Sequence, residues 1–244
     1  EKIISDKPHV LSMQTEAVLA SLDEVMKAPQ MLYNRTKSSD MHFEPVTDST
    51  GHEGPVSFAT YEVMLENSPD TTLRRNAFQS FTRGISAYQN VLGGTFATEI
   101  KKNVVLAKAR GFQSASHMFL HHQESSMTAY TNLLDMIQEG IAPHMRRYVE
   151  LRKKVLGLDE IMYCDIEAPL DPEFNPEISF EEAGRQIVAA TEIMGEEYGD
   201  IIRAACSNRW IDRVDNIGKS TGAFCAGAYD AHPYILTTWS NHAD

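Results

Sequence analysis

The chain has 244 residues, of which 42% are apolar, and its formal net charge is −12. This length suffices for one large or two modest domains with a sizeable core. The negative charge argues against a nucleic-acid or anionic-membrane partner, because phosphate binding requires clustered Lys and Arg side chains.

The first sixty residues combine a helix signal with one hairpin signal. Apolar residues recur at a helical period over residues 12–27, and Pro29 follows the expected helix end. Two short extended runs, 42–46 and 55–58, flank a turn-rich loop and place their prolines at edge positions. We therefore predict an exposed β-hairpin near residues 42–58.

A long helical segment is predicted from residue 60 onward. Ser68 is the expected N-cap, with Pro69 at the first helical position. Apolar residues then recur every three or four positions over 73–104, which predicts a buried stripe. Gly93 and Gly94 interrupt this stripe, so we expect a kink or close helix packing there.

A short helix predicted over residues 114–122 carries a histidine pair with metal-ligand spacing. His117 and His121 stand four residues apart, which suits two imidazoles on one zinc ion. The zinc-peptidase motif requires Glu directly after the first His, however, and Met118 stands there. Because the sequence places no third ligand, we interpret both as surface or helix-end histidines, with a metal site as the alternative.

Residues 128–157 have the most regular helical pattern of the chain. Pro143 falls inside it and predicts a break or kink near Gly140. The following stretch, 158–176, is proline-rich and irregular. We interpret its carboxylates as solvated rather than as a cation site; they are Asp159, Glu160, Asp165, Glu167, Asp171 and Glu173.

The composition changes near the end of the chain. Ser179, followed by Glu182 three positions later, predicts a helix start, and helices are expected up to about residue 208. The last segment is rich in Gly and Ala and ends in the β-branched and aromatic run 234–239. It predicts either a hairpin that closes a helical domain or a strand edge that pairs with an extended peptide. The expected fold is mostly α, with a short β element near residues 218–240.

Several short motifs along the chain, taken together and in their order, are characteristic. They are Ser-Pro-Asp at 68–70, Leu-Ala-Lys-Ala-Arg-Gly at 106–111, Ala-Pro-Leu-Asp-Pro at 168–172, Arg-Trp-Ile-Asp at 209–212, Gly-Lys-Ser-Thr-Gly-Ala-Phe-Cys at 218–225 and His-Pro-Tyr-Ile-Leu at 232–236. This set resembles the oligoendopeptidase F family of zinc metallopeptidases, relatives of thimet oligopeptidase. In that family His-Glu-x-x-His follows shortly afterwards, whereas this sequence reaches Asp244 first.

The resemblance implies an internal piece of such an enzyme. Residues 1–58 are expected to be the C-terminal part of the oligopeptidase F N-terminal domain, and 59–244 the N-terminal part of the M3-type catalytic domain. The complete enzyme is implied to be a cytoplasmic hydrolase of short peptides, in which zinc activates water and a Glu is the general base. We assign no catalytic or metal-binding residue to this chain, and expect it to be inactive alone and to bind no zinc through its own residues.

The resemblance also implies a substrate-binding wall in the last segment. Strand 234–237 is expected to lie beside the zinc helix and to offer backbone groups to the peptide. His232 is a candidate for contacting substrate or a transition-state oxygen, with a structural histidine bonded to the loop before Pro233 as the alternative. The expected substrate-binding residues are Gly222, Ala223, Phe224, His232, Tyr234, Ile235, Leu236 and Thr237.

The three cysteines bear on the compartment of the protein. Cys164, Cys206 and Cys225 are an odd number and widely spaced, so neither a disulfide framework nor a thiolate zinc site is predicted, and a reducing cytoplasmic setting is indicated. The sequence shows neither an apolar stretch of membrane-spanning length nor a signal-peptide core at its start. Beyond peptide hydrolysis, the alternative is a stand-alone helical interaction module without catalytic activity.

Overall fold

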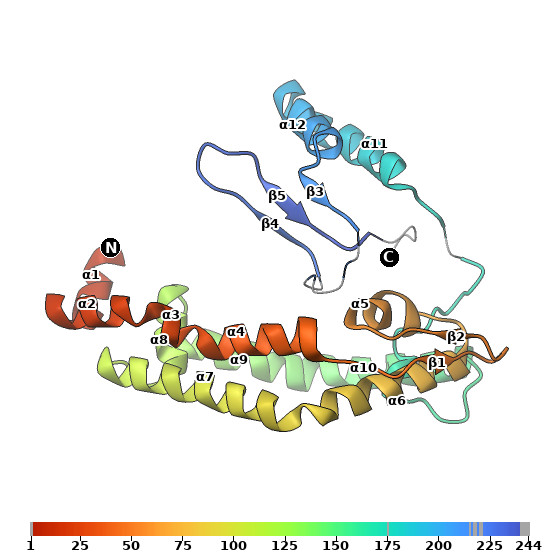
Figure 1. Cartoon of the computed structure of the whole chain (residues 1–244), viewed down its shortest axis with the longest axis horizontal. Helices are drawn as coiled ribbons and strands as arrows, with labels where there is room; N and C mark the ends of the chain where they lie inside the picture. Colours follow the sequence, from red (N-terminus) through yellow and green to blue (C-terminus); the bar gives the residue numbers. More distant parts are fainter. Residues whose placement is uncertain (1, 175, 215, 217–218, 220–221, 240–244) are drawn as a thin grey trace. The chain divides into compact units, whose positions relative to one another are not determined.

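Helices make up most of the chain, as predicted, and the strands are few and short (Figure 1). The computed structural model describes residues 2–174, 176–214, 216, 219 and 222–239. The chain divides into two units: unit 1 comprises Glu1–Met41 and Ile85–Ile161, and unit 2 comprises His42–Gly84 and Met162–Asp244. Within the described part of the chain, none of the helices has the length and apolar character needed to cross a bilayer.

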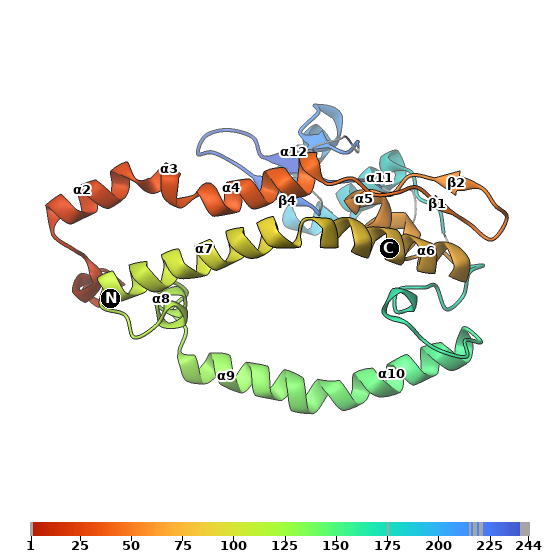
Figure 2. The same cartoon turned by 60° about the horizontal axis from the view of Figure 1, so that its bottom comes forward.

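Unit 1 is built from helices. They are α1 (Lys2–Asp6), η1 (Lys7–His9), α2 (Met13–Ser21), α3 (Asp23–Met26), α4 (Ala28–Arg35), η2 (Thr36–Asp40), α7 (Gln89–Ala109), α8 (Ala115–His122), α9 (Met127–Asp135), η4 (Met136–Ile141) and α10 (Ala142–Val155). Helix α4 lies along α7 in both views (Figures 1 and 2). The helix predicted over 12–27 is therefore present, as α2 followed by α3.

Polar contacts fasten the N-terminal helices of unit 1 to the end of α7 and to α8. The Arg110 guanidinium donates to both carboxylate oxygens of Glu16, at 2.8 and 2.9 Å. This guanidinium, helped by the Leu11 N–H, holds the pKa of Glu16 down at about 2. The ring of His9 stacks on Phe112 with centroids 3.6 Å apart.

Helices α9 and α10 are joined by the π-helical turn η4, directly before Pro143. The predicted break near Gly140 is thus confirmed. A wider turn accommodates Pro143, which has no N–H to donate to the preceding turn. We call α9, η4 and α10 together the α9–α10 rod. It runs apart from α7 in Figure 2. Its apolar face is exposed, with side chains between 41% and 55% accessible: Tyr130, Leu133, Leu134, Ile137, Ile141, Met145, Tyr148, Leu151 and Val155.

Unit 2 contains the strands. Its elements are β1 (Val46–Thr47), β2 (Glu53–Gly54), α5 (Phe58–Thr60), η3 (Tyr61–Leu65), most of α6 (Thr71–Ala87), η5 (Tyr163–Asp165), α11 (Phe180–Thr191), η6 (Glu192–Met194), α12 (Glu196–Ser207), β3 (Ile211–Asp212), β4 (Phe224–Ala226) and β5 (Tyr234–Leu236). The expected hairpin is formed by β1 and β2, with Val46 opposite Gly54.

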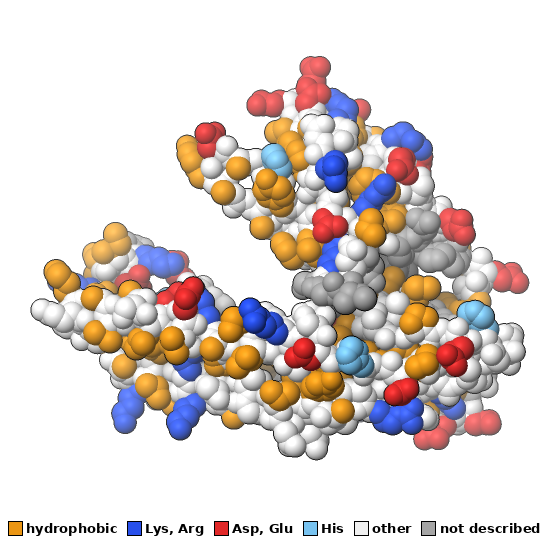
Figure 3. All heavy atoms as spheres, in the orientation of Figure 1, with side chains coloured by type: hydrophobic (Ala, Val, Ile, Leu, Met, Phe, Trp, Pro, Cys, Tyr) orange, Lys and Arg blue, Asp and Glu red, His pale blue; other side chains and the backbone are white. Residues whose placement is uncertain are grey.

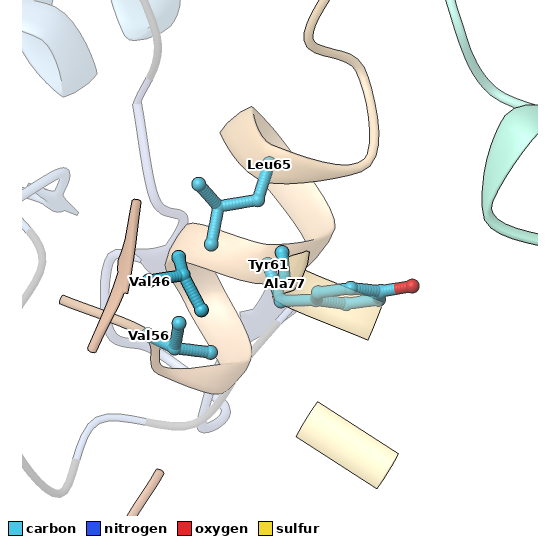
Figure 4. Packing of buried hydrophobic residues seen from close by; sticks show 5 residues of the cluster. All are labelled: Val46, Val56, Tyr61, Leu65 and Ala77. Atoms are coloured by element: carbon cyan, nitrogen blue, oxygen red, sulfur yellow. The ribbon is translucent and has the colours of Figure 1, made fainter. Parts of the chain in front are cut away.

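The hairpin, which was predicted to be exposed, contributes to a hydrophobic core of unit 2. Val46 and Val56 are buried together with Tyr61, Leu65 and Ala77 (Figure 4). Rings pack around this cluster; Phe81 lies parallel to Tyr61 with centroids 4.2 Å apart. Such close packing of large apolar side chains stabilises the folded unit.

Two local predictions about the long helical segment are wrong. Helix α6 begins at Thr71, and Asp70, not Ser68, caps it by accepting from the Thr72 and Leu73 N–H groups. The interruption falls at Tyr88 between α6 and α7, whereas Gly93 and Gly94 lie inside α7. A Cβ on either glycine would meet no neighbour within 4 Å, so close packing does not explain them.

The interpretation of Asp165 as solvated is also wrong. Its side chain is fully buried and accepts from Arg74 Nη2 at 3.0 Å and Arg75 Nη2 at 3.1 Å. Burial by itself would raise the pKa of Asp165, but the Met162 N–H and the two guanidiniums together hold that pKa below its ordinary value. This ionic cluster fixes the irregular segment after residue 161 against α6.

Candidate functional site

The last segment of the chain folds into a three-stranded sheet with the order β3–β5–β4. Strand β5 pairs in parallel with β3, with Ile235 beside Ile211, and antiparallel with β4, with Ile235 opposite Cys225. Helices α11 and α12 precede the sheet; Ser179 caps α11 by accepting from the Glu182 N–H, as predicted. The predicted β element is therefore present, and β5 is its central strand.

The position of β5 corrects the expected peptide-binding edge. Ile235 N–H donates to the Trp210 carbonyl at 2.8 Å, and Thr237 N–H donates to the Asp212 carbonyl at 2.9 Å. Tyr234 and Leu236, which alternate with these two residues, direct their backbone groups toward β4. Because both sides of β5 are paired, its backbone is not open to a peptide.

The open edge belongs to β4. Phe224 and Ala226 direct their backbone groups toward β5, so alternation along the strand directs the N–H and C=O of Cys225 outward. Among the residues that the structure describes, no strand pairs with this outer side of β4. The unpaired groups of Cys225 can therefore accept and donate bonds to an added strand.

The sheet has two different faces. Side chains opposite one another in the β4–β5 register share a face, which places Phe224, Ala226, Tyr234 and Leu236 together. We call this the open face, because Phe224 and Tyr234 are 50% and 62% exposed. In Figure 3 hydrophobic side chains gather over the part of the molecule that Figure 1 labels β4 and β5.

The other face is turned toward α11. Trp239, which has the same parity as Ile235, packs edge-on against Phe180 of α11, with centroids 5.4 Å apart. Ile211 lines a hollow together with Phe180 and Gly184. Of the predicted site residues, Ile235 therefore points toward the helices, away from the open face.

Three aromatic side chains are stacked at one end of the open face. The His232 ring lies parallel to Trp210, with centroids 4.5 Å apart and planes 5° apart. Tyr234 lies against the same His232 ring at 4.6 Å. We call Trp210, His232 and Tyr234 the aromatic stack. The Nδ1 atom of His232 also lies 3.0 Å from the carbonyl oxygen of Pro233, the next residue, rather than from the loop before it.

A buried lysine joins the ends of the strands. Lys219, whose side chain is only 5% exposed, donates through Nζ to the carbonyls of Asp212, Val214 and Thr237 at 3.1, 2.7 and 2.8 Å. Its Nζ also lies 3.1 Å from Asp212 Oδ1. The ammonium thus ties the residues after β3 to the end of β5, and Thr237 has a structural role.

The remaining predicted site residues lie at the start of β4. Gly222 has a φ of +83°, which favours glycine, and it leads through Ala223 into Phe224. Sequence reasoning missed Trp210, Lys219, Cys225 and Ala226. Only the strand register reveals that the backbone N–H and C=O of Cys225 are directed away from β5. Of the terminal motif, residues 217–218, 220–221 and 240–244, including His242, lie outside the described residues.

Each histidine of the α8 pair has a polar side-chain partner. His117 Nδ1 lies 2.8 Å from Ser114 Oγ, and His121 Nε2 lies 2.8 Å from Asp6 Oδ1. In the described part of the chain, no group of three or more His, Cys, Asp or Glu side chains could hold a metal ion. The described residues thus supply no zinc site.

Comparison with known proteins places the sequence among peptidases. The sequence profile of peptidase family M3 matches residues 64–244, and that of oligopeptidase F matches residues 1–43. Oligopeptidase PepF of Bacillus subtilis is 32% identical over the whole chain, and an oligoendopeptidase F homolog of Borreliella burgdorferi is 33% identical. The chain spans 36% and 40% of the lengths of these two relatives.

A solved structure agrees in fold. The crystal structure of oligoendopeptidase-F from Enterococcus faecium is 27% identical and superposes with a TM-score of 0.67, covering 84% of this chain and 38% of that one. The fold of most of this chain is thus that of a known architecture.

Proposed function

Because the chain belongs to peptidase family M3, we propose that it forms part of a zinc-dependent oligoendopeptidase that hydrolyses short peptides. In this proposal the chain supplies helical scaffold and one wall of the peptide-binding cleft. The relatives named oligopeptidase and oligoendopeptidase support the reaction class. Because the chain spans only 36% and 40% of these relatives, the activity of a whole enzyme is proposed rather than shown for it.

The observation that carries the proposal is the open edge of β4. An extended peptide can add to such an edge as a further antiparallel strand, with main-chain bonds for affinity and side chains for selectivity. The outward N–H and C=O of Cys225 would bond one peptide residue twice. The substrate-binding wall is therefore assigned to Gly222, Ala223 and Phe224 with their neighbours in β4, and to the open-face side chains of β5.

The zinc chemistry is assigned to polypeptide outside residues 1–244. A family zinc ion held by His-Glu-x-x-His would activate the attacking water. His-Glu-x-x-His does not occur in the sequence of residues 1–244, and we assign no catalytic step to this chain. The proposal includes a cytoplasmic setting, supported by three free thiols, and excludes nucleic-acid and membrane partners on the basis of the −12 net charge.

A hydrolysis assay tests the proposal directly. Residues 1–244 alone are expected not to cleave an internally quenched peptide of about ten residues, which is at the upper end of usual strand lengths. A fusion in which residues 1–244 replace the matching segment of the Bacillus subtilis relative, with the preceding and following segments of that relative retained, should cleave the peptide. The matched control is the same fusion with His-Gln-x-x-His, which should stay inactive because the general base is lost. Cleavage by residues 1–244 alone after rigorous purification, or a folded fusion without cleavage, contradicts the proposal.

A second candidate function rests on the exposed apolar face of the α9–α10 rod. Nine large apolar side chains on that face are accessible, and faces of this kind often bind another protein. A helical interaction module should form a defined oligomer or complex that Leu133→Glu abolishes, with no gain of peptidase activity in the fusion. Light scattering of the wild-type chain and the variant separates the two functions.

A metal protein using His117 and His121 is the remaining alternative. It requires stoichiometric zinc in the purified chain that is lost in His117→Ala, whereas our assignment expects no such zinc. Elemental analysis of the two proteins decides between them.

A further inference from the structure

The register of an added strand on β4 is defined by the strand itself. A peptide residue bonded twice to Cys225 places the preceding peptide residue opposite Ala226 and the following one opposite Phe224. Both flanking side chains lie on the open face, because they alternate with the residue opposite Cys225. The two positions thus meet different surroundings on the same face.

The surroundings of the position opposite Ala226 form a notch. Ala226 has only a methyl group, and Tyr234 lies directly across from it on β5. Neighbouring strands lie about 4.8 Å apart, so a large peptide side chain can reach over Ala226 toward the Tyr234 ring. The position opposite Phe224 offers no such notch, since a large exposed ring already stands there.

The floor of the notch is aromatic. Tyr234 lies against His232, and His232 is stacked on Trp210 with nearly parallel planes. Tyr234 is itself 62% exposed, so part of its ring is free to contact another ring. Aromatic pairs in offset or edge-on contact gain attraction beyond the area they bury.

We propose that Ala226 and the aromatic stack form a subsite for an aromatic side chain of the peptide, at the residue that precedes the one bonded to Cys225. This inference rests on the proposed function, because it needs a peptide on the β4 edge. It assigns Trp210, His232 and Tyr234 a part in selecting the peptide sequence, and it gives Ala226 the role of leaving room.

Peptide binding to residues 1–244 tests the subsite. Trp239→Phe leaves Trp210 as the single tryptophan of the chain, and its fluorescence reports contacts at the stack. The probes are acetyl-Ser-Thr-Phe-Thr-Ser-Thr-amide and the same peptide with Ser in place of Phe. We expect the Phe peptide to bind about three- to tenfold more tightly, the range that aromatic pairing provides, and to change Trp210 fluorescence more.

Variants of the stack separate a binding role from a structural one. Tyr234→Ala should reduce the preference for the Phe peptide to near unity, and Tyr234→Phe should retain it, because the ring is preserved. Ala226→Leu should weaken binding of the Phe peptide only, since the leucine fills the notch. The matched control is Tyr229→Ala, in the exposed turn between β4 and β5, which should change neither affinity. Circular dichroism verifies that each variant is folded.

The possible results distinguish two failures. Equal binding of both peptides, or a preference that survives Tyr234→Ala, overturns the subsite and leaves the β4 edge intact as a binding site. Binding of neither peptide to the folded chain overturns the subsite together with the edge on which it rests.

Discussion

Two regions of unit 2 use similar residues for opposite purposes. Residues 43–81, with the segment after residue 161, bury Val46, Tyr61 and the ionised Asp165. The terminal sheet leaves Phe224 and Tyr234 half exposed and one strand edge unpaired. Aromatic side chains thus pack into a core in the first region and are exposed to solvent in the second. Burial, rather than composition, therefore separates the stabilising part of this chain from the part that we propose binds peptide.

The largest expected effect comes from the ionic cluster of the first region. Asp165→Asn removes the charge that faces Arg74 and Arg75, both within about 3 Å of the carboxylate. Leaving a buried guanidinium uncompensated is expected to lower the free energy of unfolding by about 3–5 kcal/mol. Urea denaturation of the wild-type chain and the variant measures this difference in the free energy of unfolding. Asp159→Asn, at an exposed position, is the control and should change stability by less than about 0.5 kcal/mol.

The same aromatic truncation in the two regions should differ in its result. Phe81→Ala removes a ring that contacts Tyr61, Phe43 and Phe58, and is expected to lower stability by about 2–4 kcal/mol. Phe224→Ala removes a half-exposed ring and should lower it by less than about 1 kcal/mol. Similar losses for both variants would show that the sheet is as much a core as the first region.

A glycine in each region gives a smaller test. An alanine methyl at Gly84 would collide with the Phe43 ring, so Gly84→Ala should be destabilising by about 1–3 kcal/mol. At Gly227 the nearest atom to an added Cβ is 3.9 Å away, so Gly227→Ala should stay within about 0.5 kcal/mol of wild type. Thermal unfolding of both variants compares them, and a neutral Gly84→Ala would argue against the tight packing of α6.

The pH dependence of stability sharpens the contrast further. The folded pKa of Asp165 lies below its unfolded value, so its contribution is fully present above the unfolded pKa, near 4, and is lost as pH falls through the folded pKa. Unfolding followed by Tyr and Trp fluorescence between about pH 6 and pH 2 should show this loss. In Asp165→Asn the acid dependence should be shallower, and an unchanged slope would exclude Asp165 as its source.

Sequence patterns predicted the helices well because their signals are local. Periodicity located the long helices, Ser179 was recognised as a cap, and Pro143 marked the break in the α9–α10 rod. The glycine that follows α7, Gly111, also has the left-handed backbone typical of a helix end. Each of these features depends on residues within one or two helical turns.

Two errors were local, namely the cap of α6 and the place of the interruption between α6 and α7. The other errors concern contacts between residues far apart in sequence. Asp165 looked solvated because its partner Arg74 is 91 residues away. The edge of the sheet was assigned to β5 because β3 has only two residues, Ile211 and Asp212, with no pattern that reveals its pairing. Local sequence therefore predicted the terminal β element, whereas strand order decided which backbone groups are open.

Hydrogen exchange of the β4 amides, with and without saturating acetyl-Ser-Thr-Phe-Thr-Ser-Thr-amide, tests the central claim most directly. We expect slower exchange at the outward amide of Cys225 when peptide is bound, and little change at Ile235, whose N–H already donates to Trp210. Unchanged exchange across residues 223–227 in the presence of bound peptide would contradict the assignment of β4 as the peptide-binding edge.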